Sequence, residues 1–158
     1  MKKQHRSYGF TLIELLIVIA LLGFLSITGL SLFQGSQKRT RDSRRKTDLG
    51  QLTKALEMYA NDTGGYPAST GGKIMGCAGT TPTACEWGSA WVRGATYMQK
   101  LPKDPGSGSY CYQTVSGGYK FFAILEGDDV DKVSPLVSCN NQAIYNYVLR
   151  SSNLLLTQ

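Results

Sequence analysis

A long uncharged stretch near the N-terminus constrains this chain more than any other feature. No charged residue occurs from Leu15 to Gln37. As a helix rising about 1.5 Å per residue, the stretch is long enough to cross a hydrocarbon core of about 30 Å. A secretory signal has a shorter apolar region, about 7–15 residues, followed by a small-residue cleavage site. The sequence therefore predicts a retained membrane helix, with one carboxylate, Glu14, just before it.

The charges on either side predict how this helix is oriented. Lys2, Lys3 and Arg6 precede the apolar stretch without any acid, which places the N-terminus in the cytoplasm. A basic run at 38–46 follows the stretch, and by the same rule it favours the opposite orientation. Long domains are translocated largely regardless of their charge. We therefore expect a single-pass protein whose remainder lies outside the cytoplasm.

The four cysteines all belong to this exported part. An even number of cysteines in an exported domain favours two disulfides over a metal site. Four cysteines allow three pairings, and near neighbours in sequence meet most readily. The preferred arrangement is therefore Cys77 with Cys85, which leaves Cys111 with Cys139.

The pattern after the apolar stretch predicts that the helix continues with one buried face. Leu49, Leu52, Leu56 and Tyr59 recur at helical spacing between polar residues. The sequence at 61–67 then contains a glycine pair and a proline, which end a helix. We expect one helix from about residue 10 to about residue 61.

The rest of the chain predicts a small antiparallel sheet. Residues 68–94 have loop composition, and Gly72-Lys73 does not form a phosphate loop because Pro67 and Ile74 replace the required residues. Segments 109–114 and 119–125 are rich in strand formers and are joined by a glycine turn. A third strand is expected at either 133–138 or 144–149. The fold class is α+β, with a long N-terminal helix packed on the sheet.

A short motif ahead of the apolar stretch resembles a known signature. The run Gly9-Phe10-Thr11-Leu12-Ile13-Glu14, behind a basic leader, is similar to the N-terminus of type IV pilins and type II secretion pseudopilins, the class III signal prepilins. More weakly, Gly65-Tyr66-Pro67 and the turn at 101–105 resemble the major pseudopilin head. The resemblance implies a cleaved leader at 1–9, an apolar filament-core helix at 10–36 and a globular head at 37–158.

This resemblance implies roles for individual residues in the motif. A prepilin peptidase would cut between Gly9 and Phe10 and methylate the new amine of Phe10. Glu14 could simply reach the lipid headgroups. In a filament without headgroups, however, a carboxylate costs about 3 kcal/mol and a neighbouring amine at about 4 Å returns about 4 kcal/mol. The resemblance therefore implies that Glu14 pairs with the Phe10 amine of the next subunit.

Two charged segments of the head leave several interpretations open. The basic run Lys38–Lys46 is expected to be a solvated helix face, a contact for anionic lipid or, least supported, a contact for DNA phosphates. The acidic segment at 126–131 is expected either to be a solvated turn or to bind calcium, as the resemblance to major pseudopilins implies. No cofactor is certain. The calcium ligands would be Glu126, Asp128, Asp129 and Asp131.

These observations predict a structural subunit of a type IV pilus-like or type II secretion pseudopilus filament, extracellular or periplasmic after assembly. Implied partners are further copies, the prepilin peptidase, minor pilins, an inner-membrane platform, a cytoplasmic ATPase and the membrane before assembly. The alternatives are a DNA-uptake pilin and a single-pass membrane-anchored binding protein. An enzyme is not expected, because the only histidine, His5, lies in the leader and no catalytic constellation is recognisable.

Overall fold

The computed structural model describes residues 9–77 and 83–156, without the side chains of residues 27–32, 143, 155 and 156. The chain divides into two compact units, Met1–Gln37 and Lys38–Gln158. The helix α1, Leu12–Thr63, begins in the first unit and ends in the second. The predicted long helix is thus confirmed, with both ends within about two residues of expectation.

The end of α1 has the geometry that the glycine pair predicts. Gly64 follows the last helical residue, Thr63, with a φ of +81° in the left-handed region. Its N–H donates to the carbonyl of Ala60 at 2.8 Å, so one of the last helical carbonyls is satisfied. This is the left-handed glycine cap that commonly ends helices.

The strands of the second unit form several small antiparallel sheets. One sheet has the order β10-β7-β6 and another the order β1-β2-β3, while β4 pairs with β5 and β8 with β9. A short 3-10 helix, η1, follows the last strand. Their bounds are β1 Ser69–Thr70, β2 Lys73–Cys77, β3 Thr83–Ala84, β4 Trp91–Arg93, β5 Ala95–Met98, β6 Cys111–Val115, β7 Gly118–Ala123, β8 Val137–Cys139, β9 Gln142–Tyr145, β10 Tyr147–Arg150 and η1 Ser152–Leu156.

The aromatic hairpin lies where the sequence predicts it. β6 and β7 pair from Cys111 opposite Phe122 to Val115 opposite Gly118. The strand added to this hairpin is β10, whose Tyr147 lies opposite Ala123. Of the two segments expected to supply a third strand, the later one therefore joins the sheet, whereas part of the earlier one forms β8 and pairs with β9.

The expectation that residues 68–94 form only loop is wrong. This region contains β1, β2, β3 and β4. Each of these strands has only two to five residues, which is too short to give a clear strand signal in the sequence. They are held by contacts from elsewhere: the Tyr112 N–H donates to the Gly72 carbonyl at 2.8 Å. A Cβ on Gly72 would lie 2.6 Å from the Cys111 sulfur, so this glycine lets the turn between β1 and β2 approach β6 closely.

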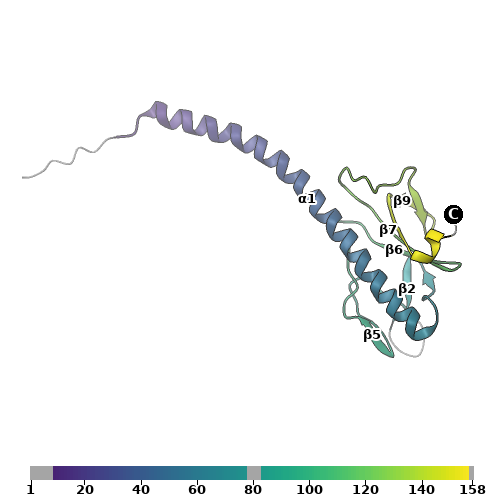
Figure 1. The fold of residues 1–158 in the computed structure, drawn as a ribbon. Coiled ribbons are helices and arrows are strands. Elements are labelled where there is room, and N and C mark those ends of the chain that lie inside the picture. The colour runs from purple at the N-terminus through teal and green to yellow at the C-terminus, as the bar shows by residue number, and fades with distance from the viewer. Residues whose placement is uncertain (1–8, 78–82, 157–158) are drawn as a thin grey trace, which may run out of the picture. The chain divides into compact units, whose positions relative to one another are not determined.

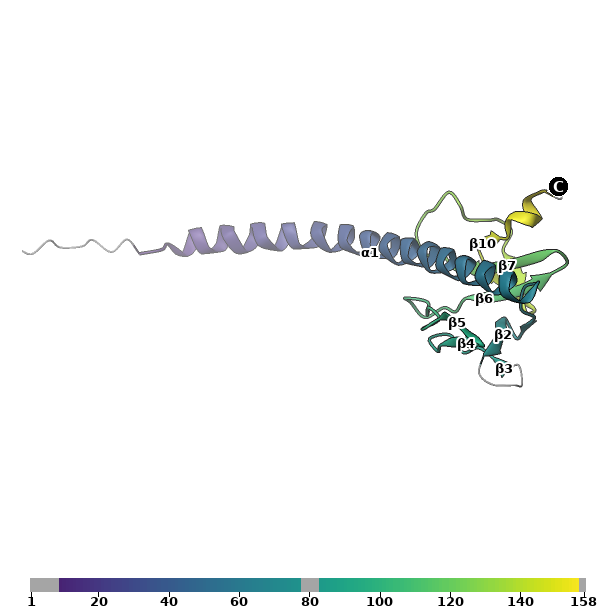
Figure 2. The same ribbon diagram turned by 60° about the horizontal axis from the view of Figure 1, so that its bottom comes forward.

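The core of the second unit lies between α1 and the strands. Figures 1 and 2 show the β4–β5 hairpin on one flank of the C-terminal part of α1 and the C-terminal segment on the other. The predicted helix face is fully confirmed, because all its members are buried. That face is Leu49, Leu52, Leu56 and Tyr59, and it packs with Ile74, Trp91, Leu101, Tyr112, Tyr119 and Phe121.

Candidate assembly site and charged helix–loop cluster

The start of α1 is closed by hydrogen bonds between Thr11 and Glu14. The Glu14 N–H donates to Thr11 Oγ1 at 3.3 Å, and the Thr11 N–H donates to Glu14 Oε2 at 2.9 Å. The Thr11 hydroxyl also donates to Oε2 at 2.7 Å. This reciprocal arrangement is a capping box, which satisfies backbone donors that the first helical turn would leave without partners.

The sequence interpretation of Glu14 missed this local role. A threonine followed three residues later by a glutamate, ahead of an apolar run, is the sequence pattern of a capping box. Thr11-Leu12-Ile13-Glu14 fits that pattern. Both hydrogen bonds that Thr11 donates end on Oε2, and Glu14 Oε1 has no hydrogen bond or ion pair within the described part of the chain. The carboxylate thus caps its own helix and retains an oxygen for another donor.

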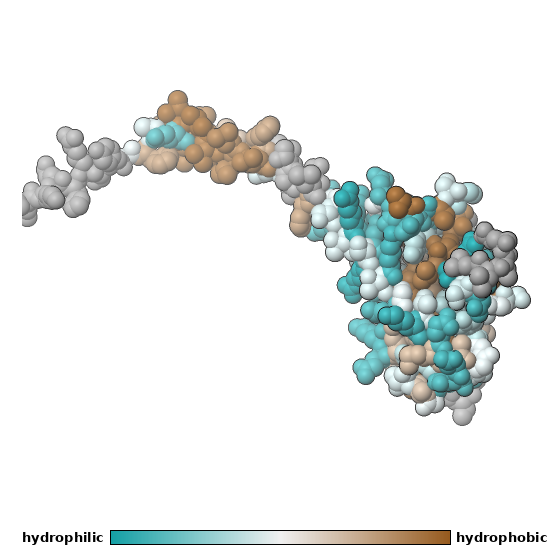
Figure 3. All heavy atoms as spheres, viewed as in Figure 1, coloured by the Kyte–Doolittle hydropathy of each residue, from teal (hydrophilic) through white to brown (hydrophobic). Residues whose placement is uncertain are grey.

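The first turns of α1 display apolar side chains on all sides. The exposed fractions are 87% for Leu12 and 66% for Ile13, and Phe10, just before the helix, is 77% exposed. Figure 3 shows mostly hydrophobic residues on the visible face of this part of the helix. A contiguous apolar surface of this kind marks a site that contacts protein or lipid. Among the described residues, no helix qualifies as long and apolar enough to cross a membrane.

The residues of the expected cleavage site lie directly before α1. Gly9 and Phe10 are exposed and have no regular secondary structure. A Cβ placed on Gly9 would meet no atom within 4 Å. The remainder of the predicted leader, residues 1–8, lies outside the described residues.

A partly buried ion-pair cluster joins α1 to two loops of the head. Arg45 donates to Asp42 at 2.7 Å and, through two nitrogens, to Asp104 at 2.7 and 2.8 Å. It also donates to Glu126 at 2.7 Å, and Arg41 Nε donates to the same carboxylate at 3.0 Å. We call Arg41, Asp42, Arg45, Asp104 and Glu126 the charged cluster.

The charged cluster shifts the pKa values of Glu126 and Arg45. Hydrogen bonds from Arg41 and then Arg45 lower the pKa of Glu126 to about 2. The pKa of Arg45 is raised, chiefly by its hydrogen bonds to Asp104. Buried charges remain ionised when they are paired in this way. Arg45 and Glu126 therefore stay ionised at neutral pH.

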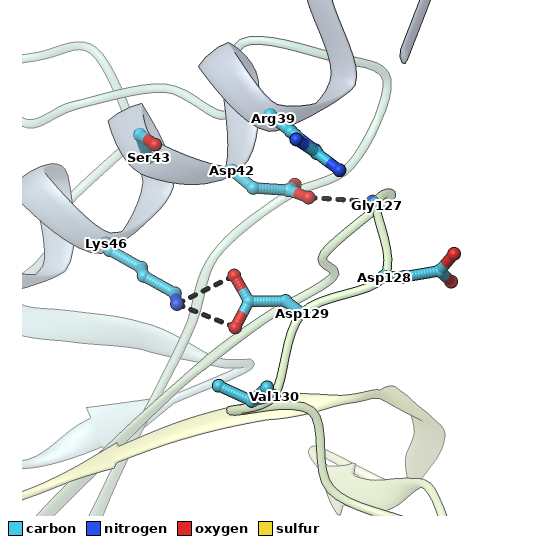
Figure 4. A pocket seen from close by; sticks show the side chains of 8 residues that line it. All are labelled: Arg39, Asp42, Ser43, Lys46, Gly127, Asp128, Asp129 and Val130. Atoms are coloured by element: carbon cyan, nitrogen blue, oxygen red, sulfur yellow. Dashed lines mark hydrogen bonds and ion pairs between the residues drawn. The ribbon is translucent and has the colours of Figure 1, made fainter. Parts of the chain in front are cut away.

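The acidic segment at 126–131 meets α1 one turn further along the helix. Lys46 Nζ donates to Asp129 at 2.8 Å and to Asp131 at 2.6 Å. The N–H groups of Glu126 and Gly127 donate to the Asp42 carboxylate, the latter at 2.7 Å. Figure 4 shows the pocket between helix and loop, with Asp128 pointing away from Lys46.

These contacts correct the interpretation of part of the basic run at 38–46, whereas Lys38, Arg39 and Arg44 are exposed as a solvated face requires. None of its expected roles, as a solvated face or as a contact for lipid or DNA, includes pairing within the chain. Arg41, Arg45 and Lys46 instead form ion pairs with acids of the head, and Arg45 is buried. The acidic segment is largely exposed, as a solvated turn requires, but Glu126, Asp129 and Asp131 also form ion pairs with α1. Sequence separations of 59 to 85 residues hide such pairs from any local pattern.

The cysteines pair as the loop-length argument prefers. Cys77 bonds to Cys85 and Cys111 bonds to Cys139, and none is free among the described residues. The first disulfide joins β2 to the segment after β3, and the second joins β6 to β8. Each disulfide thus ties together short strands with few ladder hydrogen bonds.

Comparison with known proteins identifies two family models. The model for the prokaryotic N-terminal methylation motif matches residues 4–30, and the model for type II secretion system protein G matches residues 33–132. No solved structure gives a significant match.

Curated relatives agree with these matches. The type II secretion system core protein G of Vibrio cholerae serotype O1 is 33% identical over 112 residues, which cover 71% of this chain and 74% of the relative. The protein of the same name from Aeromonas hydrophila is 31% identical, covering 68% of this chain and 73% of the relative. That from Pseudomonas aeruginosa is 30% identical, covering 71% and 76%.

Proposed function

The chain belongs to the family of type II secretion system protein G, the major pseudopilin, and we propose that it assembles through its N-terminal helix into a helical filament. As a pseudopilin it is a structural protein and not an enzyme. The methylation motif implies a precursor anchored in the inner membrane. In the proposed filament the apolar helices form the core and the heads lie outside.

The observation that carries this proposal is the exposed apolar surface of α1. Side chains from Phe10 to Leu25 are uncovered in the single chain, although soluble domains rarely leave a continuous apolar surface open. Lipid would cover this surface before assembly, and equivalent helices of neighbouring copies would cover it afterwards. The N-terminus would face the cytoplasm and the head the periplasm.

Processing would prepare the N-terminus for this assembly. We propose that a prepilin peptidase cuts between Gly9 and Phe10 and methylates the Phe10 amine. The irregular, exposed backbone at both residues supports access by a peptidase. The capping box would survive the cut, because its donors belong to Thr11 and Glu14. Mass spectrometry of the mature chain should find methylated Phe10 first, whereas a chain starting at Met1 would support an anchored, unprocessed protein.

Glu14 would then have two functions. Oε2 accepts hydrogen bonds from Thr11 of its own chain, and a carboxylate has room for further donors at Oε1. We propose that the Phe10 amine of a neighbouring copy is this further donor. The pairing would offset the cost of a charge in an apolar filament core.

Further partners follow from the same assignment. We propose minor pilins, an inner-membrane platform and a cytoplasmic ATPase as the machinery that extends the filament. A DNA-uptake pilus has less support, because Arg41, Arg45 and Lys46 are engaged with acids of their own chain. DNA binding requires cations that are available to phosphates.

Substitutions at the capping box separate the pairing from the capping. Glu14→Gln keeps the capping box but removes the charge, since glutamine serves equally at this position. Thr11→Ala removes the hydroxyl but keeps the charge. If Glu14 pairs with the Phe10 amine of a neighbouring copy, Glu14→Gln and Glu14→Ala should be processed but should form no filaments in sheared fractions. Thr11→Ala should still form filaments. Filaments from Glu14→Gln together with none from Thr11→Ala would assign Glu14 to capping alone.

A further inference from the structure

The backbone of the acidic segment at 126–131 is hydrogen-bonded to α1. Asp42 accepts hydrogen bonds from the N–H groups of Glu126 and Gly127, at 3.0 and 2.7 Å. A Cβ on Gly127 would lie 3.2 Å from the Asp42 carboxylate, so the segment passes close to the helix. The carboxylates that follow Gly127 are therefore held near the next turn of α1.

Lys46 lies between two of these carboxylates. Its Nζ is 2.8 Å from Asp129 and 2.6 Å from Asp131, and the Asp131 N–H donates to Asp129 Oδ1 at 2.9 Å. Nζ also lies 5.6 Å from the centre of the Tyr147 ring, a favourable position for a cation. Asp129 and Asp131 thus converge on a cation that belongs to the chain itself.

The residues expected to bind calcium do not fit that ion in this arrangement. Calcium takes about 6–8 oxygen ligands at about 2.3–2.6 Å, so it would need the space that the Lys46 ammonium fills. Glu126 is already bound by Arg41 and Arg45. In Figure 4, Asp128 points away from Lys46. Across the described residues, no group of three or more metal-ligating side chains comes together.

We infer that Lys46 replaces a divalent cation in this chain, so that the segment at 126–131 is held on α1 without calcium. The ammonium neutralises Asp129 and Asp131, and the arginines neutralise Glu126. A calcium ion beside Lys46 would meet a like charge at close range. The inference concerns the stability of the head and does not depend on the proposed filament.

Thermal unfolding of the full chain in detergent tests this inference. The wild type, Lys46→Met and Lys54→Met are compared in about 10 mM CaCl2, above the Kd of weak extracellular calcium sites, and in EGTA at matched ionic strength. Lys54 is the control, because it is an exposed lysine of the same helix that has no ion pair among the described residues. Calorimetric titration with CaCl2 gives a second readout.

We expect calcium to change the Tm of the wild type by less than about 1 °C, because no ligand stabilises a fold it does not bind. Lys46→Met should lower the Tm by about 3 °C in EGTA, the effect of losing a small ion-pair network. Lys54→Met should not change it. A wild-type Tm that rises by several degrees in calcium, with heat of binding, would overturn the inference. A Tm of Lys46→Met equal to that of Lys54→Met would also overturn the inference.

Discussion

Arg45 and Asp104 form a doubly hydrogen-bonded ion pair that is sealed from solvent. Nε donates to Oδ2 at 2.7 Å and Nη2 donates to Oδ1 at 2.8 Å, with side-chain exposures of 3% and 1%. Arg45 lies on α1, and Asp104 lies in the turn that leads to β6. The parallel pair of hydrogen bonds fixes this turn against the helix, which lysine could not do with the same geometry.

Removing Arg45 should strongly destabilise the head. Arg45→Met would leave Asp42 and Asp104 buried without a cation, which typically costs about 3–5 kcal/mol. Urea unfolding of the full chain in detergent, followed by tryptophan fluorescence, measures the change. Arg44→Met is the matched control, because Arg44 is exposed and has no ion pair within the described residues. A loss below about 1 kcal/mol for Arg45→Met would contradict a structural role for the charged cluster.

Acid should weaken the head through Glu126. Its pKa is lowered from 4.5 to about 2 in the folded chain, so the unfolded chain binds protons more readily. The stabilisation is therefore complete above about pH 4.5 and is lost as the pH falls toward 2. The free energy of unfolding should decrease over this window. In Glu126→Gln the decrease should be shallower, and an identical slope would show that Glu126 is not the responsible group.

The two disulfides should contribute unequally. The cysteines of Cys111–Cys139 are 28 residues apart and those of Cys77–Cys85 are 8 apart. The loop-entropy model gives about 1 kcal/mol more stabilisation for the longer loop. Replacing each pair by alanine compares them fairly, since all four cysteines are buried. Equal losses in urea unfolding, or a larger loss for the shorter loop, would contradict this order.

Two glycines should respond oppositely to alanine. A Cβ on Gly106 would lie 2.8 Å from Arg45 Nη2, an atom held by Asp104 and Glu126, so Gly106→Ala should destabilise the head. Gly50 lies inside α1, where a Cβ meets nothing within 4 Å. Gly50→Ala should stabilise the head by up to about 1 kcal/mol through helix propensity. The same unfolding measurement decides both, and Gly106→Ala at wild-type stability would show that the cluster tolerates displacement.

The sequence predicts much of the fold because several of its signals are local. Helical spacing identifies the buried face from Leu49 to Tyr59, and the glycine pair at 64–65 marks the helix end. The aromatic hairpin is equally visible, because its strands are rich in β-formers around a glycine turn. The strands at 69–93 escape prediction because they are very short, and backbone pairing and a disulfide hold them in place.

The candidate site, too, is only partly predictable from the sequence. The pattern around Gly9, Phe10 and Glu14 is short and contiguous, so sequence alone indicates prepilin processing. The charged cluster is different, because Arg45 meets Glu126 across 81 residues of sequence. From its composition alone, each charged segment is expected to be solvated, because the sequence does not show that the fold brings the two together. Their complementary charges are the one available signal, and it does not specify which residues pair.

The structure of the assembled filament would show whether the chain assembles through its N-terminal helix. Electron cryomicroscopy of sheared filaments would give the distance between the Glu14 carboxylate and the Phe10 amine of the adjacent copy. Assembly through the N-terminal helix predicts that these groups lie within about 4 Å of each other, with Thr11 still capping the helix. A separation beyond about 10 Å would show that the two groups are not paired and would contradict assembly through this contact.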